Sequence, residues 1–368
     1  MTDKKIYKYP RLTELASCFL GIFLFALMLR NSEVTIAYIK EGISLCRDTL
    51  IPALFPFMVV SELFVASGSA GALGAMLSKP MRFLFGINGD GAVAIVLGAL
   101  SGFPIGALCA ISLLERGRIS KSECERLIAI SSNPSSAFLI SATGISLFGS
   151  REFGRALYAA TLLSSLLVGI LLNLVSKKGK KEAPQKEEAR ALNSINRRHI
   201  KASDLSSSIV SSAESMLKVC AFVVFFTAFV GVLCRALESF GASEELKATV
   251  CSLFELSGGV AKAASIRPIY LGGVIAAFAA GWSGISVHLQ IATLCSGKNI
   301  SLLPYFISKL ICGILSAAII GIYLKISPPT FYTDTPTALI TPRGAYIISG
   351  VFLSAITINA LLRILKHR

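Results

Sequence analysis

The chain has 368 residues, of which 54% are hydrophobic and only 15% are charged, and its mean hydropathy is +0.69. Soluble domains carry about 25% charged residues. Apolar runs recur along the whole chain, and a helix needs about 20 apolar residues to cross a bilayer. This composition excludes an ordinary soluble multidomain protein and predicts an all-α polytopic membrane protein.

The formal net charge of +15 comes largely from basic residues beside apolar runs. Segment 177–201 holds nine Lys or Arg and three Glu, and further basic residues lie at 4–11 and 363–368. Basic flanks of this kind mark cytoplasmic loops, whereas a nucleic-acid surface needs them clustered on a folded domain. We therefore expect both termini and 177–201 to be cytoplasmic, membrane lipid as the surroundings, and no nucleic-acid partner.

The nine cysteines lie mostly in apolar runs and form no C-x-x-C pair. This pattern predicts small buried side chains rather than a metal site or a disulfide frame. No P-loop, Ser/His/Asp set or metalloprotease motif is present either. We therefore expect no enzyme activity, no cofactor and no ATP-driven step within this chain.

About eight transmembrane helices are predicted from the long apolar segments. These segments are 14–30, 49–67, 90–113, 153–175, 212–236, 268–296, 303–325 and 344–365. The shorter mixed segments 34–48 and 73–87 are typical of interfacial amphipathic helices. The serine-rich segment 131–148 is too short for a comfortable span, and we expect a re-entrant hairpin there.

The order of the segments predicts two inverted repeats. With the N-terminus and 177–201 both cytoplasmic, residues 34–176 start outside and end inside, whereas residues 205–325 start inside and end outside. Residues 102–128 and 281–311 also share a similar order of glycine, aromatic, basic and Ile-Ser positions. Inverted repeats underlie many secondary transporters. The predicted organisation is 1–33 (N-terminal end and first helix), 34–176 (first repeat), 177–204 (basic linker), 205–325 (second repeat) and 326–368 (loop and last helix).

Broken helices are predicted where Gly102, Pro104 and Gly106 interrupt an apolar run. Irregular backbone at membrane depth is tolerated only where it is buried in protein or lines a polar cavity. The free N–H groups of a half-helix then attract anions. The alternative is plain helix packing, because small residues four apart are common in membrane helices.

Two further breaks resemble this one. Gly281 and Gly284 interrupt a second apolar run, and Asn133, Pro134 and Ser135 form a helix-start signal. Three such breaks predict a central binding site.

Ionisable residues in apolar segments are the other candidates. His288 shares a helical face with Gly281 and Gly284, and its alternative reading is a neutral histidine bonded to a neighbouring carbonyl. Glu62 and Glu255 are candidates for binding a coupling proton or sodium ion, unless they are solvated helix ends. Hydrogen-bonding side chains near His288 are Ser283, Ser286 and Gln290.

Several motifs resemble the YlbJ family of sporulation integral membrane proteins. They are "TLIPALFPFMVVSELFVASG", "LSGFPIGA", "ERGRIS", "SSNPSSAFLI" and "GWSGISVHLQ", and they follow one another between residues 34 and 325. That family is grouped with nucleoside-recognition Gate domain proteins, which are distantly similar to concentrative nucleoside transporters. "GWSGIS" departs from the family pattern, because a tryptophan and a serine separate its glycines.

This resemblance implies a multi-pass protein of an endospore-forming bacterium, in the plasma membrane or the outer forespore membrane. Relatives are associated with moving dipicolinate, a small aromatic dianion, into the developing spore. The positions where the motifs match, and which the resemblance therefore marks as substrate-binding, are Gly102, Phe103, Pro104, Gly106, Asn133, Pro134, Gly284 and His288.

We therefore expect a secondary transporter of a small anionic metabolite, dipicolinate foremost, that works by alternating access and forms a homo-oligomer. One alternative is a nucleoside or nucleobase transporter. The other is a membrane scaffold of a sporulation complex without a substrate, in which the glycines only pack helices and 177–201 binds a partner or lipid.

Overall fold

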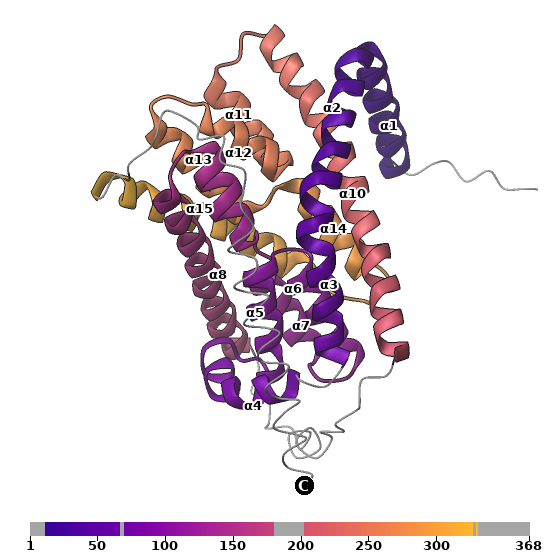
Figure 1. Cartoon of the computed structure of the whole chain (residues 1–368), viewed down its shortest axis with the longest axis vertical. Coiled ribbons are helices and arrows are strands. Elements are labelled where there is room, and N and C mark those ends of the chain that lie inside the picture. The colour runs from indigo at the N-terminus through magenta and orange to yellow at the C-terminus, as the bar shows by residue number, and fades with distance from the viewer. Residues whose placement is uncertain (1–11, 67–69, 180–201, 327–328, 330–368) are drawn as a thin grey trace, which may run out of the picture. The chain divides into compact units, whose positions relative to one another are not determined.

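The computed structural model describes residues 12–66, 70–179, 202–326 and 329. These residues form helices joined by short turns, with no strand among them, which confirms the predicted all-α class (Figure 1). The first half holds α1 (Leu12–Arg30), α2 (Ser32–Leu45), η1 (Cys46–Leu50), α3 (Ile51–Ala66), α4 (Ala70–Pro80), η2 (Met81–Phe85), η3 (Gly89–Gly91), α5 (Ala92–Ser101), α6 (Ile105–Glu115), α7 (Lys121–Ser131), η4 (Ala137–Leu147) and α8 (Arg151–Gly179). The second half holds α10 (Ala202–Ser239), α11 (Glu244–Phe254), α12 (Leu256–Ala264), α13 (Ile269–Trp282), α14 (Gly284–Cys295) and α15 (Leu303–Ile326).

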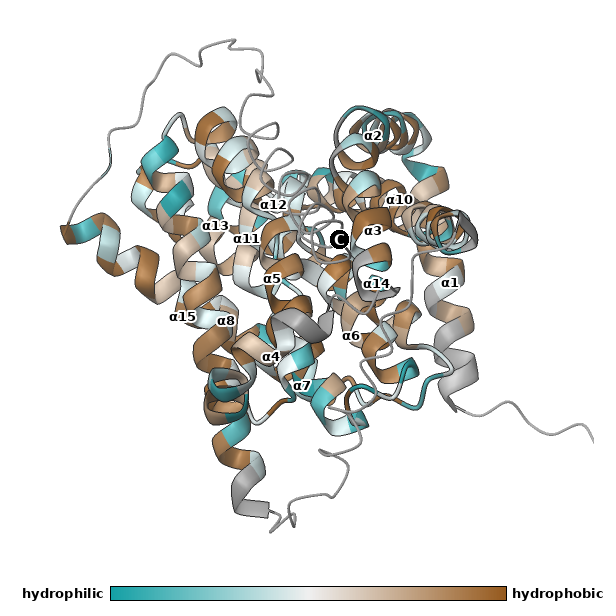
Figure 2. Cartoon of the chain, turned by 60° about the horizontal axis from the view of Figure 1, so that its bottom comes forward, coloured by the Kyte–Doolittle hydropathy of each residue, from teal (hydrophilic) through white to brown (hydrophobic). Residues whose placement is uncertain are grey.

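Membrane-crossing helices are present in both halves. Among the described residues, four helices are long and apolar enough to cross a membrane, and two bent helix pairs raise the number to six if each pair is one span. The four are Arg151–Ser176, Asp204–Ser239, Ile269–Cys295 and Leu303–Ile326. The predicted segment 344–365 lies outside the described residues. Most of α3, α5 and α6 consists of hydrophobic residues, drawn brown in Figure 2. The chain is therefore a multi-pass membrane protein.

The predicted interfacial helix 34–48 is wrong as a separate element. Helices α2, η1 and α3 follow one another without a gap from residue 32 to residue 66. The long helix α10 packs along both α2 and α3 (Figure 1). Small residues permit the close approach, since a Cβ on Gly42 would lie 2.9 Å from the Cα of Val224.

Helices α5 and α6 form a hairpin, in which the start of α5 lies beside the end of α6 and the end of α5 lies beside the start of α6. At its base, Arg118 just after α6 pairs with Asp90 just before α5, with Nε 2.5 Å from Oδ2. Nearer the tip, a Cβ on Gly98 would lie 3.1 Å from the Cα of Gly106. The predicted break in 90–113 is therefore present, but the segment turns back on itself rather than crossing once.

The "ERGRIS" motif closes the base of this hairpin. Ser120 caps α7, and its hydroxyl accepts the Glu123 N–H while the Glu123 carboxylate accepts the Ser120 N–H. The other Glu123 oxygen accepts the Asn88 N–H at 2.7 Å. The motif thus satisfies helix-end backbone groups and ties the α6–α7 turn to the start of α5.

The predicted re-entrant hairpin at 131–148 is also wrong. The segment contains the end of α7, a break at 132–136 and the single π-helix η4, so the second leg that a hairpin needs is missing. Helix η4 packs instead against α8, where a Cβ on Gly154 would lie 2.9 Å from the Cα of Gly144. The break arises because Pro134 lacks an N–H and disfavours helical backbone at the residue before it.

The second half contains a matching hairpin, α11–α12. Its legs touch, since a Cβ on Gly259 would meet the backbone of Ser252, and Glu255 forms the tip. Helices α13 and α14 then follow as one span that is interrupted at Ser283. Together with α15 and α8, α13 lines the main apolar core, which includes Phe153, Ala276 and Ile320.

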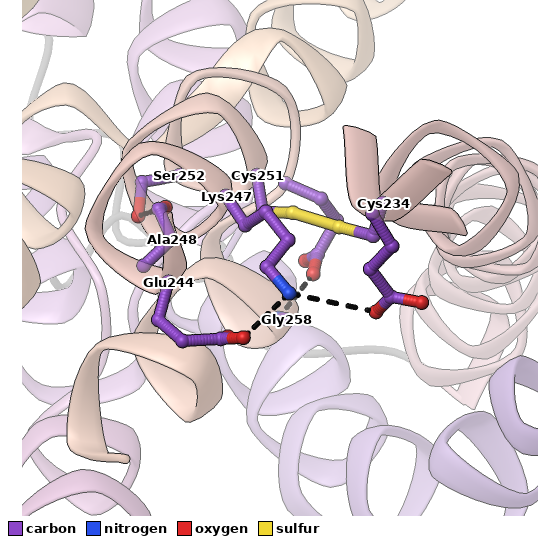
Figure 3. Close-up of a disulfide and its surroundings, with 9 residues drawn as sticks. Cys234, Glu244, Lys247, Ala248, Cys251, Ser252 and Gly258 are labelled. Atoms are coloured by element: carbon purple, nitrogen blue, oxygen red, sulfur yellow. Dashed lines mark hydrogen bonds and ion pairs between the residues drawn. A yellow bond between two sulfur atoms is a disulfide. The ribbon is translucent and has the colours of Figure 1, made fainter. Parts of the chain in front are cut away.

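A disulfide joins Cys234 of α10 to Cys251 of α11 (Figure 3). The prediction of unpaired cysteines is wrong for this pair. The two cysteines are 17 residues apart in the chain, and the turn between α10 and α11 brings their sulfurs together. The other cysteines in the described residues are free, and five of these seven are buried as predicted, namely Cys46, Cys109, Cys124, Cys295 and Cys312.

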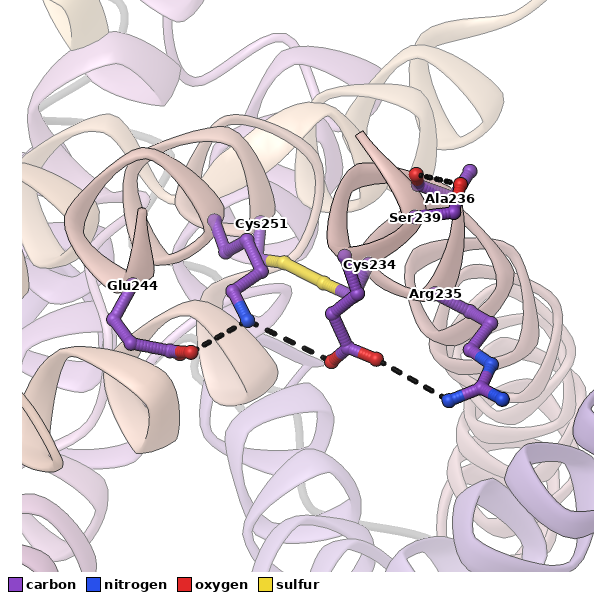
Figure 4. Close-up of polar contacts among 8 residues, drawn as sticks. Cys234, Arg235, Ala236, Ser239, Glu244 and Cys251 are labelled. Atoms are coloured by element: carbon purple, nitrogen blue, oxygen red, sulfur yellow. Dashed lines mark hydrogen bonds and ion pairs between the residues drawn. A yellow bond between two sulfur atoms is a disulfide. The ribbon is translucent and has the colours of Figure 1, made fainter. Parts of the chain in front are cut away.

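Ion pairs reinforce the same helix junction (Figure 4). Lys247 Nζ lies 2.6 Å from Glu244 and 3.7 Å from Glu238, and Glu238 also pairs with Arg235. The hydrogen bond from Glu244 raises the pKa of the Lys247 ammonium above its usual value. The end of α10 and the start of α11 are therefore held by charge as well as by a covalent bond.

Close packing of α6 against α7 predicts that Gly106→Val destabilises the fold. Any Cβ at this position would overlap the Ser131 carbonyl oxygen, and overpacking of this kind costs about 1–3 kcal/mol. The thermal midpoint of the detergent-purified variant should fall by several degrees. Gly21→Ala is the control, because nothing lies within 4 Å of a Cβ there. Equal midpoints for the two variants would contradict the close packing.

Candidate functional site

The tip of the α5–α6 hairpin docks onto the break between α7 and η4. Gly102 has a φ of 83°, which L side chains rarely adopt, and a Cβ there would lie 2.6 Å from the Ser135 N atom. The Phe103 N–H donates to the Asn133 carbonyl oxygen at 2.8 Å. The first two predicted breaks, at 102–104 and 133–135, are therefore brought into direct contact.

A second contact of the same kind lies between the α11–α12 tip and the α13–α14 break. Ser283 and Gly284 both have positive φ, 75° and 83°, and a Cβ on Gly284 would lie 3.1 Å from the Glu255 N atom. The Trp282 indole N–H donates to the Leu253 carbonyl oxygen at 3.0 Å. Each half of the chain thus places a hairpin tip against a broken helix.

Glu255 caps α12 with its buried carboxylate. One oxygen accepts the Ser257 N–H at 3.0 Å and the other accepts the Gly258 N–H at 2.6 Å. The carboxylate therefore satisfies free N–H groups of a helix start, and its negative charge suits the positive end of the helix.

Lys309 of α15 brings a fully buried positive charge to the α7–η4 break. Its ammonium donates to the Asn133 side-chain oxygen at 2.9 Å, and the residue is 0% exposed. The Asn133 amide group donates in turn to the Ile130 carbonyl oxygen at 2.8 Å. No carboxylate within the described ranges forms an ion pair with Lys309. Buried lysines are normally paired with a negative charge, so this one is available to an anion.

His288 lies four residues after Gly284 and is 2% exposed. Its Nδ1 lies 3.0 Å from the Tyr305 hydroxyl, whereas its Nε2 has no hydrogen-bond partner within the part of the chain that the structure describes. Tyr305 is one helical turn before Lys309 on α15, so the two side chains share a helical face. The site therefore offers a buried cation and, beside it, an imidazole nitrogen with an unused hydrogen bond.

Buried hydroxyl groups line the helices around Lys309. The Ser165 hydroxyl donates to the Ile130 carbonyl oxygen at 2.7 Å, and the hydroxyls of Thr161 and Ser316 lie 3.5 Å apart. Ser132 and Ser308, the neighbours of Asn133 and Lys309, carry buried hydroxyls without partners. The interior of this region is polar, which plain helix packing does not require.

Some predicted site residues lie elsewhere or have a packing role. Glu62 lines a cavity of about one water volume between α3 and α6, with Ser61 and Ser112 beside it. A Cβ on Gly281 would lie 2.5 Å from the Cys312 carbonyl oxygen, so this glycine permits close helix packing. The Gln290 amide group donates to the Ser286 hydroxyl at 3.4 Å, and its oxygen has no partner.

Lys309 and Tyr305 were not among the sequence candidates. The available signal was a lysine in the second turn of an apolar 24-residue helix, since an ionisable residue in a membrane helix marks a functional site by default. The sequence comparison of 102–128 with 281–311 instead treated Lys309 as one basic position in a motif.

The two halves also meet where the α6–α7 and α14–α15 turns come together. Lys298 pairs with Glu115, and the Ser301 N–H donates to the Glu125 carboxylate at 2.8 Å. Equivalent loops of an inverted pair must lie on opposite faces of the membrane. The motif match between 102–128 and 281–311 therefore does not mark equivalent positions.

These features define a polytopic α-helical membrane protein whose broken helices meet hairpin tips around a buried polar centre. The chain is 27% identical over 338 residues to sporulation integral membrane protein YlbJ of Bacillus subtilis (strain 168), covering 84% of this chain and 82% of that protein. This similarity supports the resemblance to the YlbJ family that the motifs indicate. No family model matches the sequence, and no solved structure matches it.

The Asn133–Lys309 contact predicts a specific pattern of stability. Asn133→Leu leaves the ammonium buried without its hydrogen-bond partner and should cost about 1.5–3 kcal/mol, seen as a fall in thermal midpoint. Adding Lys309→Met should recover most of the loss, because an apolar pair of similar size replaces the polar one. Lys309→Met alone is the control. If Asn133→Leu has the same thermal midpoint as the parent protein, the contact does not stabilise the fold.

Proposed function

We propose that this protein is a secondary transporter of spore formation that moves a small anionic metabolite, dipicolinate foremost, by alternating access. The observation that carries the proposal is the buried Lys309 ammonium, which lies at a helix break and has a neutral amide oxygen as its hydrogen-bond partner. An anion that enters the protein would meet this charge without having to displace a carboxylate. The sporulation role rests on the relative from Bacillus subtilis.

The order of elements supports an inverted repeat as the framework for transport. In 34–176 the long helical run α2–α3 is followed, after α4 and η2 that have no counterpart in the second half, by the α5–α6 hairpin, the broken pair α7–η4 and the long helix α8. In 205–325 the same order runs through α10, α11–α12, α13–α14 and α15. Repeats of this kind place a substrate site at broken helices near the midplane. The proposal keeps the Gate-domain resemblance, and it places both termini in the cytoplasm and the protein in the plasma membrane or the outer forespore membrane.

Glu255 is our proposed group for a coupling proton or sodium ion. Its carboxylate lies at the hairpin tip that contacts the Ser283–Gly284 break, where a change of charge would alter the docking of the tip. The cavity beside Glu62 is the second candidate for such an ion.

Ligand-dependent stability of the detergent-purified protein tests the substrate. Dipicolinate at a hundred times its dissociation constant should add about 2.7 kcal/mol to the free energy of unfolding. Lys309→Met should abolish the shift, since the anion loses its buried cation. Lys218→Met, which removes an exposed lysine of α10, should leave the shift unchanged.

Three other outcomes of this measurement would overturn the proposal. A shift with uridine or nucleobases alone would identify a nucleoside carrier. A dipicolinate shift that persists in Lys309→Met would place the anion elsewhere. No shift with any ligand, together with no uptake into proteoliposomes, would favour the alternative that the protein is a membrane scaffold without a substrate.

Alternating access predicts that the Lys298–Glu115 contact must separate during each cycle. Glu115→Cys with Lys298→Cys should therefore lose uptake when oxidised and regain it with a dithiol reductant. Each single variant, oxidised in the same way, controls for the native cysteines. Uptake that continues through a proven cross-link would show that this end of the protein stays closed during transport.

A further inference from the structure

We propose that Tyr305 fixes His288 as a neutral imidazole with its proton on Nε2, so that His288 presents a hydrogen-bond donor to the anion held by Lys309. The position of the proton follows from the geometry of the pair. The role toward an anion rests on the proposed function.

The pair is closed off from water and from other partners. Tyr305 is 0% exposed, and the one hydrogen-bond partner of its hydroxyl among the described residues is His288 Nδ1, at 3.0 Å. The imidazole ring is also held by edge-to-face contacts, with ring centroids 4.2 Å from Trp282 and 5.2 Å from Phe306. The ring therefore has little freedom to exchange one nitrogen for the other.

Counting protons selects one of the two tautomers. A neutral imidazole has one donor and one acceptor nitrogen, and a phenol has one proton to donate. If Nδ1–H donated to Tyr305, both the phenol proton and the Nε2 lone pair would lack partners. If Tyr305 donates to Nδ1, only the Nε2–H of His288 remains unpaired. Buried polar groups without partners are costly, so the second arrangement is favoured.

The unpaired Nε2–H then needs an explanation, because almost all buried polar groups in proteins are hydrogen-bonded. His288 follows the Ser283–Gly284 break, and Tyr305 is one turn from Lys309 on α15. A ligand anion on the ammonium with a second acceptor oxygen would satisfy this donor. The class of ligand is thus an oxyanion with at least two separated acceptor groups.

Nitrogen-15 NMR of histidine-labelled protein tests the tautomer without any ligand. The chain has only three histidines, so His288→Gln assigns the His288 signals. We expect a protonated Nε2 and an unprotonated Nδ1 in the parent protein, and a shift toward mixed tautomers in Tyr305→Phe. Tyr323→Phe on the same helix is the matched control and should leave the signals unchanged. A protonated Nδ1 in the parent would overturn the proposal, whether or not the variants fold.

Binding of dipicolinate tests the donor role. A glutamine amide reaches the position of Nε2, whereas the shorter asparagine amide reaches that of Nδ1. We expect His288→Gln to bind within about threefold of the parent, and His288→Asn and Tyr305→Phe to bind at least about tenfold more weakly. Equal affinities of the Gln and Asn variants would overturn the donor role. If the parent itself binds no dipicolinate, the proposed substrate fails while the NMR result still decides the tautomer.

Discussion

The rest of the structure depends on one constraint, the cost of placing a charge and broken backbone in an apolar interior. The Lys309 ammonium is fully buried in a membrane helix, and the Asn133 oxygen is its partner. Asn133 is available there because α7 ends at Ser131, before Pro134, which cannot continue the helix. The helix break and the buried charge therefore explain each other, since each supplies the polar contact that the other needs.

Satisfying the broken backbone shapes the two halves in the same way. A hairpin tip covers each break, with Phe103 donating to the Asn133 carbonyl in the first half and Trp282 donating to the Leu253 carbonyl in the second. Glycines at the contacts let the backbones approach to distances that a Cβ would prevent. Backbone groups that would be too costly in lipid become part of a protein-lined centre.

The periphery holds this centre in place by different means. The α5–α6 hairpin is closed at its base by the Asp90–Arg118 ion pair, and the α10–α11 junction is held by the Cys234–Cys251 disulfide. The Glu115–Lys298 contact joins the two halves at exposed turns, where charge pairs are weak and easily separated.

The sequence by itself determined the membrane class, the all-α fold, the resemblance to a known family and the places where helices break. These follow from local properties: apolar length, the missing N–H of Pro134, and glycine at positions such as Gly102. It did not determine the direction of the chain after each break, so that 90–113 was expected to cross and 131–148 to return. Only the tertiary structure decided that Lys309 meets Asn133, that Tyr305 meets His288 and that Cys234 meets Cys251. Those contacts join side chains on different helices, from 17 residues apart for the last two pairs to 176 residues apart for Lys309 and Asn133. The physical cost of leaving each group unpaired is not visible in the spacing of residues along one helix.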